Sequence, residues 1–577
     1  MELADLLKCA TDWLKFDSDL ESKTTIRSWI AEQDQTALLT HFNQRLRFGT
    51  AGLRGPLGPG PNAMNSTLIR IVCEGLSRVI LNGSASRSVV IGYDGRHGSY
   101  SFAKMSARVL ASRGIAVHLS DKVCPTPLLS YCVNALNADA GIMVTASHNP
   151  PKDNGFKVYW SNGAQIIPPQ DQQISNAIDE VWEKATLQEE LPTIEDFDTL
   201  KAQGKVIPLD PDIENKYIAD VLKLRVYNGD TTKIKIVYTA MHGVGYALFN
   251  RVLDAVGYSQ LLPVESQVYP DPDFPTVAFP NPEEPGALDL ACELAKRTNA
   301  TIVLAHDPDA DRLAVMARDH TNELRAFTGD QIGALIAHEL FTHVHPSALD
   351  MVATTIVSSN LLSVMATEEK VRFAETLTGF KWIANQGIKH LSEVSTDGGR
   401  FLFGYEEAIG FSLGGLVCDK DGISAGLFLA DMAARAHAQN LTLWDKLAEI
   451  YQRYGLYLSA LRSRVRPGIS GAKEIAGWMH ALRQNVPTYI GTCKVIQYTD
   501  YLKRDDILYG NVLRFQLEGG ARVIARPSGT EPKIKFYFEW VEPFTTDESL
   551  DVVNTRGAEQ LNRLIHSFES YIDSLDC

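Results

Sequence analysis

Residues 140–150 read AGIMVTASHNP and join an apolar run to a short polar loop. The run Ala140–Val144 has the length and composition of a buried strand, and Pro150 stops the element. The loop therefore places the hydroxyl of Ser147 at the tip of a strand, with His148 beside it. A serine is a weak nucleophile until a base, a metal or a charged neighbour activates it. Because a serine after a strand is more often a helix cap, the nucleophile interpretation needs supporting residues elsewhere.

Strand-like runs alternate with helical patterns over most of the chain, which is typical of α/β units. The strand-like runs are 88–93, 115–119, 140–144, 233–239, 301–305, 351–357 and 401–403. This alternation of strands and helices starts again three times along the chain. The last hundred residues have a different pattern, which predicts a smaller α+β unit. Residues before 46 show the pattern of two amphipathic helices, with Trp13, Leu14, Ile26, Trp29 and Ile30 as apolar anchors. The predicted divisions are a helical extension (1–45), domain I with the serine loop (46–215), domain II (216–345), domain III (346–460) and a smaller α+β domain IV (461–577).

Composition excludes several classes of function. The chain of 577 residues carries a net charge of −15, so its long-range field repels nucleic acid and anionic membranes. No apolar run approaches the roughly 18 residues that a membrane span needs. Eight scattered cysteines and an acidic Met1–Asp5 segment favour a reducing compartment without a signal peptide. We therefore expect a cytoplasmic protein that binds small molecules.

A second polar loop, HDPDADR at 306–312, follows the apolar run 301–305. If the loop is extended, Asp307, Asp309 and Asp311 point to one side and their oxygens converge on one cation. Oxygen ligands suit a hard ion such as Mg²⁺. The alternative is a solvated acidic turn, but apolar residues on both sides predict burial, where three carboxylates repel one another unless a positive charge lies among them.

Three further segments carry polar groups with less specific patterns. Glu406 and Glu407, in the 404–410 loop, could accept hydrogen bonds from paired sugar hydroxyls or could be surface charge. Lys420 lies between two aspartates, as either a salt-bridged turn or an active-site cation. The glycine-rich segment 48–55 is a turn, or it lets Arg54 approach an anion.

The last polar loop, RPSGTEPKIK at 526–535, combines groups that bind phosphate. Arginine can grip a phosphate with two hydrogen bonds, hydroxyls donate, and a glycine lets backbone N–H groups form an anion nest. A structural turn is the alternative. The anion-compatible groups are Arg526, Ser528, Gly529, Thr530 and Lys535. Together with a hydroxyl nucleophile, a metal site and a sugar-reading loop, they indicate phosphoryl transfer on a phosphorylated sugar.

With these motifs in order (TASHNP, DPDADR, GYEEAIG, RPSGTEPK), the chain resembles the α-D-phosphohexomutase superfamily over nearly its whole length. The local variants at 48–55, 154–159, 378–382 and 404–410 are similar to the phosphopentomutase-type branch, also called phosphoglucomutase type 2. That branch includes a glucose-1,6-bisphosphate synthase relative. The resemblance implies four domains around a central cleft, of which the first three share one mixed-sheet α/β topology.

The resemblance also implies roles for individual residues. Ser147 would be a phosphoserine, and one Mg²⁺ would lie between its phosphate and Asp307, Asp309 and Asp311. Glu406 and Glu407 would read sugar hydroxyls, and Lys420 would serve substrate binding or proton transfer. The remaining residues would neutralise the transferred phosphoryl group (Arg54, His148, Lys157, Arg312), line the opposite wall (Thr378, Lys381) or grip the second phosphate (Arg526, Ser528, Gly529, Thr530, Lys535).

The activity so implied interconverts sugar 1-phosphates with 5- or 6-phosphates through a bisphosphate, in a monomer primed by a sugar bisphosphate. The competing interpretations are a bisphosphate synthase with an acyl-phosphate donor, a phosphatase and an inactive binding paralogue. Many phosphoglucomutases have a serine where this chain has Ala408, which argues against strict hexose specificity. The general base stays open among His148, Lys157 and Lys420.

Overall fold

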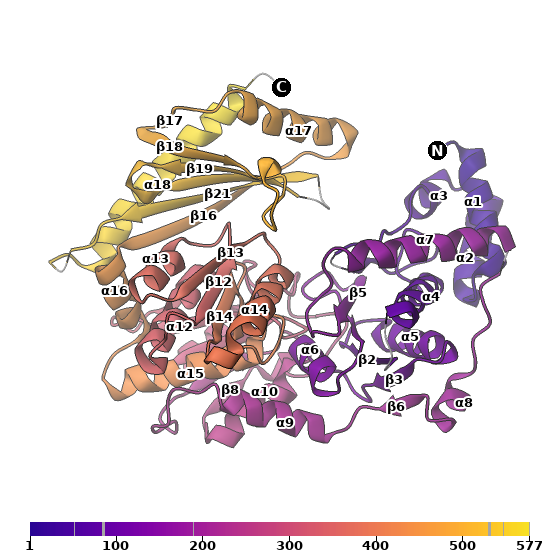
Figure 1. Ribbon diagram of the computed structural model, residues 1–577, viewed down its shortest axis with the longest axis horizontal. Helices are drawn as coiled ribbons and strands as arrows, with labels where there is room; N and C mark the ends of the chain where they lie inside the picture. Colours follow the sequence, from indigo (N-terminus) through magenta and orange to yellow (C-terminus); the bar gives the residue numbers. More distant parts are fainter. Residues whose placement is uncertain (51, 84–86, 189, 529–531, 546, 576–577) are drawn as a thin grey trace.

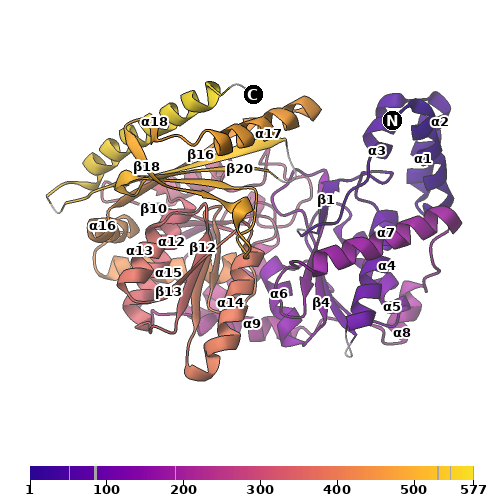
Figure 2. The same ribbon diagram turned by 45° about the horizontal axis from the view of Figure 1, so that its top comes forward.

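The computed structural model describes residues 1–577 except 51, 84–86, 189, 529–531, 546 and 576–577. Within the described residues the strands form four sheets that follow one another along the chain (Figure 1). The second view places the fourth sheet beside the helices of the third, and the N-terminal helices at the far end of the first (Figure 2). Among the described helices none has the length and apolar character needed to cross a bilayer.

The first sheet has six strands in the order β1-β5-β4-β2-β3-β6. Four of them are parallel, and β5 runs antiparallel to β4 and to β1. Val89 and Ile91 pack into the core on one face, whereas Val90 packs into the core on the other. Burial on both faces is why this strand is continuously apolar. The strands are β1 (Leu53–Pro56), β2 (Ser88–Tyr93), β3 (Ala116–Leu119), β4 (Ala140–Val144), β5 (Asp153–Trp160) and β6 (Val206–Pro208).

Helices cover both faces of this first sheet. Those with core residues on the Val89 side are α4 (Ser66–Gly83), α5 (Ser99–Ser112), α7 (Gln170–Gln188) and α8 (Phe197–Ala202). Those on the Val90 side are α6 (Thr126–Ala135) and α9 (Asp212–Leu222), and their core continues into the second and third sheets. This shared core ties the three α/β units together.

The second sheet has the strand order β11-β10-β9-β7-β8 and the third has β13-β12-β14-β15. Their strands are β7 (Ile236–Thr239), β8 (Leu261–Pro263), β9 (Ile302–His306), β10 (Leu313–Arg318), β11 (Leu324–Ala326), β12 (Met351–Thr355), β13 (Arg372–Thr376), β14 (Phe401–Glu406) and β15 (Gly410–Leu413). The helices that accompany them are α10 (Gly245–Val256), α11 (Asp289–Thr298), α12 (Gly329–Val344), α13 (Leu361–Glu368), α14 (Phe380–Val394), α15 (Gly422–Ala438) and α16 (Leu443–Tyr454).

The first three sheets share one feature that positions the polar loops. In each, a strand with a parallel neighbour turns back and pairs antiparallel with the next strand: β4 with β5, β9 with β10, and β14 with β15. The serine loop, the aspartate loop and the glutamate loop are the connections of these three equivalent hairpins. The mixed-sheet topology predicted for the first three domains is thereby confirmed.

The fourth sheet is antiparallel throughout, in the order β16-β21-β20-β19-β18-β17. Its strands are β16 (Leu456–Val465), β17 (Tyr489–Ile490), β18 (Cys493–Asp500), β19 (Leu513–Leu517), β20 (Arg522–Pro527) and β21 (Lys533–Glu542), and its helices are α17 (Gly468–Gln484) and α18 (Leu550–Asp573). Phe568 of α18 packs against Phe515, Phe536 and Phe538 of the sheet. This is the smaller α+β unit that the sequence predicts.

The N-terminal extension contains three helices where the sequence pattern predicts two: α1 (Leu3–Phe16), α2 (Leu20–Glu32) and α3 (Gln35–Phe42). The second predicted helix breaks because Gln33 adopts a left-handed conformation (φ 51°) and Asp34 starts a new helix by accepting a hydrogen bond from the Ala37 N–H. Trp13 of α1 packs against Trp182 of α7 with 5.7 Å between ring centroids.

Candidate active site

The serine loop is a tight turn rather than a helix cap. Ser147 is buried, and its backbone is in the left-handed region with φ 52°, which is strained for a residue with a side chain. Its N–H donates to the Thr145 hydroxyl at 2.9 Å, and that hydroxyl donates to Asp94 at 2.6 Å. The turn is therefore braced by buried hydrogen bonds that keep the Ser147 side chain at its apex.

A buried arginine that the sequence analysis missed holds this loop from behind. The two terminal nitrogens of Arg96 donate four hydrogen bonds of 2.6–3.2 Å to backbone carbonyls of Ser147, Asn149, Pro150 and Asp153. Asp94 pairs with the guanidinium at 3.3 Å. The positions of Asp94 and Arg96 in the sequence could have indicated this role. Both come soon after β2, and Ser147 comes soon after the parallel strand β4, so all three lie at the same edge of the sheet.

Three aspartates of the β9–β10 connection face the serine. Asp307, Asp309 and Asp311 are all buried, and one carboxylate oxygen from each lies within 4.8 Å of the others. The loop is not extended as predicted but turns through Ala310 (φ 57°), so curvature rather than strand alternation brings the carboxylates together. The Ser147 hydroxyl donates to Asp307 Oδ2 at 2.7 Å.

Two lysines neutralise part of this acidic cluster, one from a strand of the first sheet and one from the connection between β15 and α15. The Lys157 amine on β5 donates to Asp309 at 2.8 Å and to Asp311 at 3.0 Å. Lys420 lies 3.3 Å from Asp311 and 3.8 Å from Glu406, so it is a buried cation of the cluster rather than a surface turn. Burial alone would lower the pKa of the Lys157 amine, but the two aspartates outweigh it and raise that pKa.

The pKa values of two of the aspartates are shifted in opposite directions. Burial, with Asp309 and Asp311 as like-charged neighbours, raises the pKa of Asp307 well above its usual value. Burial would also raise the pKa of Asp309, but Lys157 reverses this and lowers it. Among the described residues Asp309 Oδ1 and Asp311 Oδ1 are buried without a hydrogen-bond partner. Buried carboxylate oxygens without donors fit a hard divalent cation such as Mg²⁺.

Further cationic and basic groups surround the serine. The Nδ1 atom of His148 lies 3.2 Å from Ser147 Oγ, and burial followed by the charges of Arg312 and Arg54 lowers the pKa of this imidazole well below 6.5. His148 is therefore neutral at pH 7. Arg54, exposed at the first strand, donates to the Asn149 side chain at 3.1 Å, and Arg312 pairs with Glu283 at 3.3 Å.

The glutamate loop adds two carboxylates at the end of β14. A carboxylate oxygen of Glu406 lies 3.8 Å from the Lys420 amine. Glu407 accepts hydrogen bonds from the hydroxyls of Thr355 at 3.2 Å and Ser358 at 3.1 Å. Burial and the neighbouring charge of Glu406 raise the pKa of Glu407 to about 7. Thr355 and Ser358 were not predicted as site residues, although Thr355 ends β12 and Ser358 follows that strand.

The structure does not bring Thr378 and Lys381 into contact with the aspartates. Across the described residues, no hydrogen bond or ion pair joins either side chain to the cluster. The Thr378 hydroxyl is buried without a partner among those residues. Lys381, at the start of α14, is largely surrounded by protein; burial lowers the pKa of its amine to about 8 despite the nearby Asp171.

The predicted phosphate loop connects β20 and β21. Arg526 and Lys535 are directly opposite each other on these strands, a like-charged pair that an anion would stabilise. Arg526 forms a hydrogen bond with Tyr537, which lies near Glu407 of the third unit. Glu283 of the second unit lies near both Arg312 and Lys535. The Ser528 N–H donates to the Lys533 carbonyl at 2.8 Å. Gly529 and Thr530 lie outside the described residues.

Family models match the chain in four consecutive segments. Residues 45–185, 215–320 and 328–454 match the phosphoglucomutase/phosphomannomutase alpha/beta/alpha domains I, II and III. Residues 496–545 match the C-terminal domain of the same family. The order of the four matches is the order of the four sheets.

Curated relatives cover nearly the whole chain. Human phosphopentomutase is 34% identical, over 97% of this chain and 94% of its own length. Human glucose 1,6-bisphosphate synthase is 34% identical (93% and 90%), and a probable phosphomannomutase of Haemophilus influenzae is 39% identical (82% and 93%). A crystal structure described as a putative phosphomannomutase from Thermus thermophilus has the same fold, with a TM-score of 0.68, 22% identity and coverage of 92% and 100%. The chain belongs to the phosphoglucomutase/phosphomannomutase family.

Proposed function

We propose that this protein is an intramolecular phosphotransferase that interconverts sugar 1-phosphates with 5- or 6-phosphates through a phosphoserine. The observation that carries the proposal is the hydrogen bond from the Ser147 hydroxyl to Asp307, at the centre of a buried acidic cluster lined by lysines. A nucleophile in this setting suits phosphoryl transfer, in which catalysis depends on positioning and on charge neutralisation.

The chain's own residues have separable tasks in the first half-reaction. The phosphoryl group on Ser147 Oγ passes to the free hydroxyl of the bound sugar, so the Oγ–P bond breaks while a new O–P bond forms. Arg54 and Arg312 stabilise the charge on the phosphoryl oxygens. The sugar hydroxyl gives its proton to a base, and the departing Ser147 Oγ gains a proton to become the hydroxyl. Neutral His148 suits this exchange, because its ring lies 3.2 Å from Ser147 Oγ.

A divalent metal would supply further charge neutralisation in this site. Asp307, Asp309, Asp311 and a phosphoserine oxygen would hold one Mg²⁺, which would neutralise negative charge on the phosphoryl group during transfer. The two unpartnered oxygens of Asp309 and Asp311 support this assignment. A sugar bisphosphate would serve as primer, because it can phosphorylate Ser147 in a newly made protein.

The second half-reaction needs a place for the phosphate that does not react. Arg526 and Lys535, opposite each other on β20 and β21, would hold that phosphate with Ser528, Gly529 and Thr530. Thr378 and Lys381 would line the wall across from the glutamates. The bisphosphate then turns so that its other phosphate faces Ser147, and the serine takes that phosphate back. Glu406 and Glu407 can hold the sugar in both orientations, because they would contact its hydroxyls.

The substrates we propose are pentose and hexose phosphates, with ribose, deoxyribose and glucose 1-phosphates as the first candidates. The human relative named phosphopentomutase and the chain's Ala408 support a pentose, whereas the relative named phosphomannomutase supports a hexose. The test compares kcat/KM for ribose 1-phosphate and glucose 1-phosphate, with Mg²⁺ and a trace of the matching bisphosphate. Absence of turnover with either sugar, from protein phosphorylated on Ser147, would contradict the proposal.

A second candidate activity is synthesis of glucose 1,6-bisphosphate from an acyl phosphate, because a human relative of equal identity has that name. The two activities share the first phosphoryl transfer and differ in the donor that restores phosphoserine. Turnover of a sugar 1-phosphate without any acyl phosphate favours the mutase. Bisphosphate that accumulates only with an acyl-phosphate donor favours the synthase.

We also propose that one chain works as a monomer in the cytoplasm. A monomer is supported because the side chains gathered around the serine and the aspartates come from the first three α/β units of a single chain. A reducing compartment is supported by the seven cysteines at described positions, which are all free thiols. Sedimentation analysis and cell fractionation test these two statements.

A further inference from the structure

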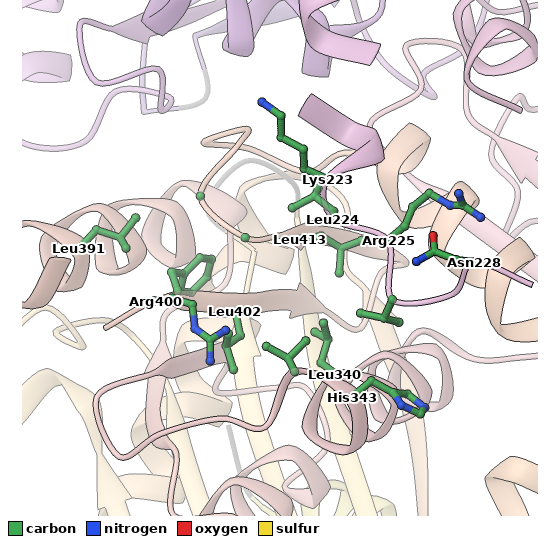
Figure 3. A pocket seen from close by; sticks show the side chains of 15 residues that line it. Lys223, Leu224, Arg225, Asn228, Leu340, His343, Leu391, Arg400, Leu402 and Leu413 are labelled. Carbon is green, nitrogen blue, oxygen red and sulfur yellow. The ribbon is translucent and has the colours of Figure 1, made fainter. Parts of the chain in front are cut away.

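A cavity of about 710 Å³ lies between the second and third α/β units, and none of its described lining residues belongs to the serine loop (Figure 3). One wall is the segment between α9 and β7, with Leu224 and Arg225; the others come from the ends of α12 and α14, the start of β14 and the end of β15. Strand β14 begins in this cavity at Phe401 and ends at Glu406 in the candidate active site. Five residue steps of strand separate the two by about 16 Å.

The inner surface of the cavity is aliphatic. Leu340, Leu402 and Leu413 gather at its centre, and the aliphatic lining is completed by Leu224, Val226, Val344 and Leu391 (Figure 3). The volume lies within the range of about 300–1,000 Å³ that is usual for small-molecule sites. A lining of this kind takes up the aliphatic body of a ligand.

The polar groups of the lining are cationic or neutral. Lys223, Arg225, Arg400 and His343 surround the leucines, together with Asn228, and none of the described lining residues is an aspartate or glutamate. In a chain with a net charge of −15 this is an unusual local composition. It selects a ligand with an anionic end.

Carboxylates behind the wall hold the two guanidiniums in place. Arg400 donates from Nε and Nη2 to the buried Asp350 at 3.1 and 2.6 Å, and Arg225 donates likewise to the buried Asp431 at 2.8 and 3.1 Å. For neither arginine is a hydrogen bond from Nη1 found within the part of the chain that the structure describes. Lys223 likewise pairs with Asp220, at 2.6 Å, although its side chain is 75% exposed. Because these carboxylates offset much of the charge, the oriented Nη1 donors of the arginines supply the specific recognition.

We propose that this cavity binds an amphipathic anion. An aliphatic body of the ligand packs against the leucines and valines. A carboxylate or phosphate group accepts hydrogen bonds from Arg400 and from Lys223, whose exposed amine exchanges its Asp220 partner for the ligand. This site is separate from the candidate active site and does not depend on the proposed mutase activity.

The test is calorimetric titration of the full chain with decanoate and decyl phosphate, which share a body and differ in the anionic group. Decanol and acetate are the controls, because each has only one half of the recognised chemistry. We expect one ligand per chain, with at least one of the two anions binding tenfold or more tightly than either control. Equal affinity for decanol and both anions, or no binding of either anion, would overturn the proposal.

Three variants locate the binding. Arg400→Gln removes the donor, Lys223→Gln removes an exposed amine at low risk to the fold, and Val344→Trp fills the space. The matched control is Arg453→Gln, because its side chain is 45% exposed, against 46% for Arg400, and pairs with glutamates elsewhere on the same unit. We expect each cavity variant to weaken binding at least fivefold while the control binds as the wild type does. If the affinities of Lys223→Gln and Val344→Trp equal that of the wild type, the ligand binds elsewhere and the proposal is wrong.

Discussion

The Ser147 hydroxyl lies 2.7 Å from a carboxylate oxygen of Asp307, although the two residues are 160 positions apart and belong to different sheets. Both sit in hairpin connections at the ends of buried strands, β4 and β9. The contact places a nucleophile at the edge of a site that fits a metal.

If Ser147 carries the phosphoryl group, Ser147→Ala should lower mutase turnover about 10⁴-fold or more while sugar-phosphate binding persists.

Coupled turnover assays and calorimetric binding of glucose 1-phosphate check this prediction. Ser392→Ala, an exposed serine at the end of α14, is the control for handling and folding. A Ser147→Ala enzyme with near-normal turnover would remove the serine from the mechanism.

Mg²⁺ should stabilise the folded protein as well as support turnover. The aspartate cluster holds mutually repelling carboxylates when folded, and a cation that binds only this state adds about 2.7 kcal/mol at 100 times its Kd. Thermal unfolding with EDTA and with Mg²⁺ measures the shift. Asp307→Asn should abolish most of it, whereas Asp273→Asn, an exposed aspartate elsewhere, should retain it. Equal shifts in both variants would place the ion at another site.

Arg96→Gln should lower kcat more than it changes KM. The guanidinium holds four carbonyls of the serine loop, and a displacement of the nucleophile by about 1 Å can cost roughly 100-fold in rate. Loss of a buried ion pair should also cost about 3 kcal/mol of unfolding free energy. Single-turnover phosphorylation of Ser147, measured well below the unfolding temperature, separates the two effects. A variant that loses stability but phosphorylates at the normal rate would show that Arg96 is only structural.

The pKa of Glu407, raised to about 7 by burial and by Glu406, predicts a pH dependence of sugar binding. As the pH falls through 7 the carboxylate gains a proton and loses an acceptor for sugar hydroxyls. We expect kcat/KM to fall about tenfold between pH 8 and pH 6. Glu407→Gln cannot titrate, so it should have a lower kcat/KM without this step. The phosphate of the substrate also titrates in this range, and it does so equally with the wild type and with Glu407→Gln. If kcat/KM of the variant still falls between pH 8 and pH 6, the fall is due to the substrate and not to Glu407.

The opposed Arg526 and Lys535 predict a phosphate site on the fourth sheet. Charge-assisted hydrogen bonds contribute about 1.5–3 kcal/mol each, so Arg526→Gln or Lys535→Gln should raise KM roughly 10- to 100-fold and change kcat less. Steady-state kinetics at fixed ionic strength measure both constants. Lys494→Gln, on an exposed part of β18 in the same sheet, should leave them unchanged. A similar KM for all three variants would rule out this clamp.

The cavity between the second and third units could not be predicted from sequence motifs. Its leucines and arginines come from five separated segments, and each segment by itself reads as ordinary core or linker. The same holds for Arg96, whose importance lies in carbonyl groups that no sequence pattern displays. Residues that act on the backbone of another loop are hard to predict, because backbone groups are alike at every position.

Local patterns in the sequence determined the strands and the chemistry of the loops. The run 88–93 is a strand over the predicted range because burial on both faces requires an unbroken apolar run. The polar loop predicted after residue 144 starts at a strand end, and the one predicted after 305 starts one residue early. The third prediction was wrong in its bounds, because β14 continues past residue 403 to Glu406. Tertiary structure alone decided which charges meet. The turn at Ala310 gathers the aspartates, and Lys157 and Lys420 reach them from the first and third α/β units. Burial then raises the pKa of Asp307, whereas Lys157 lowers that of Asp309. Electrostatic energy depends on distance and burial, and for residues far apart in the chain both quantities exist only once the sheets have packed.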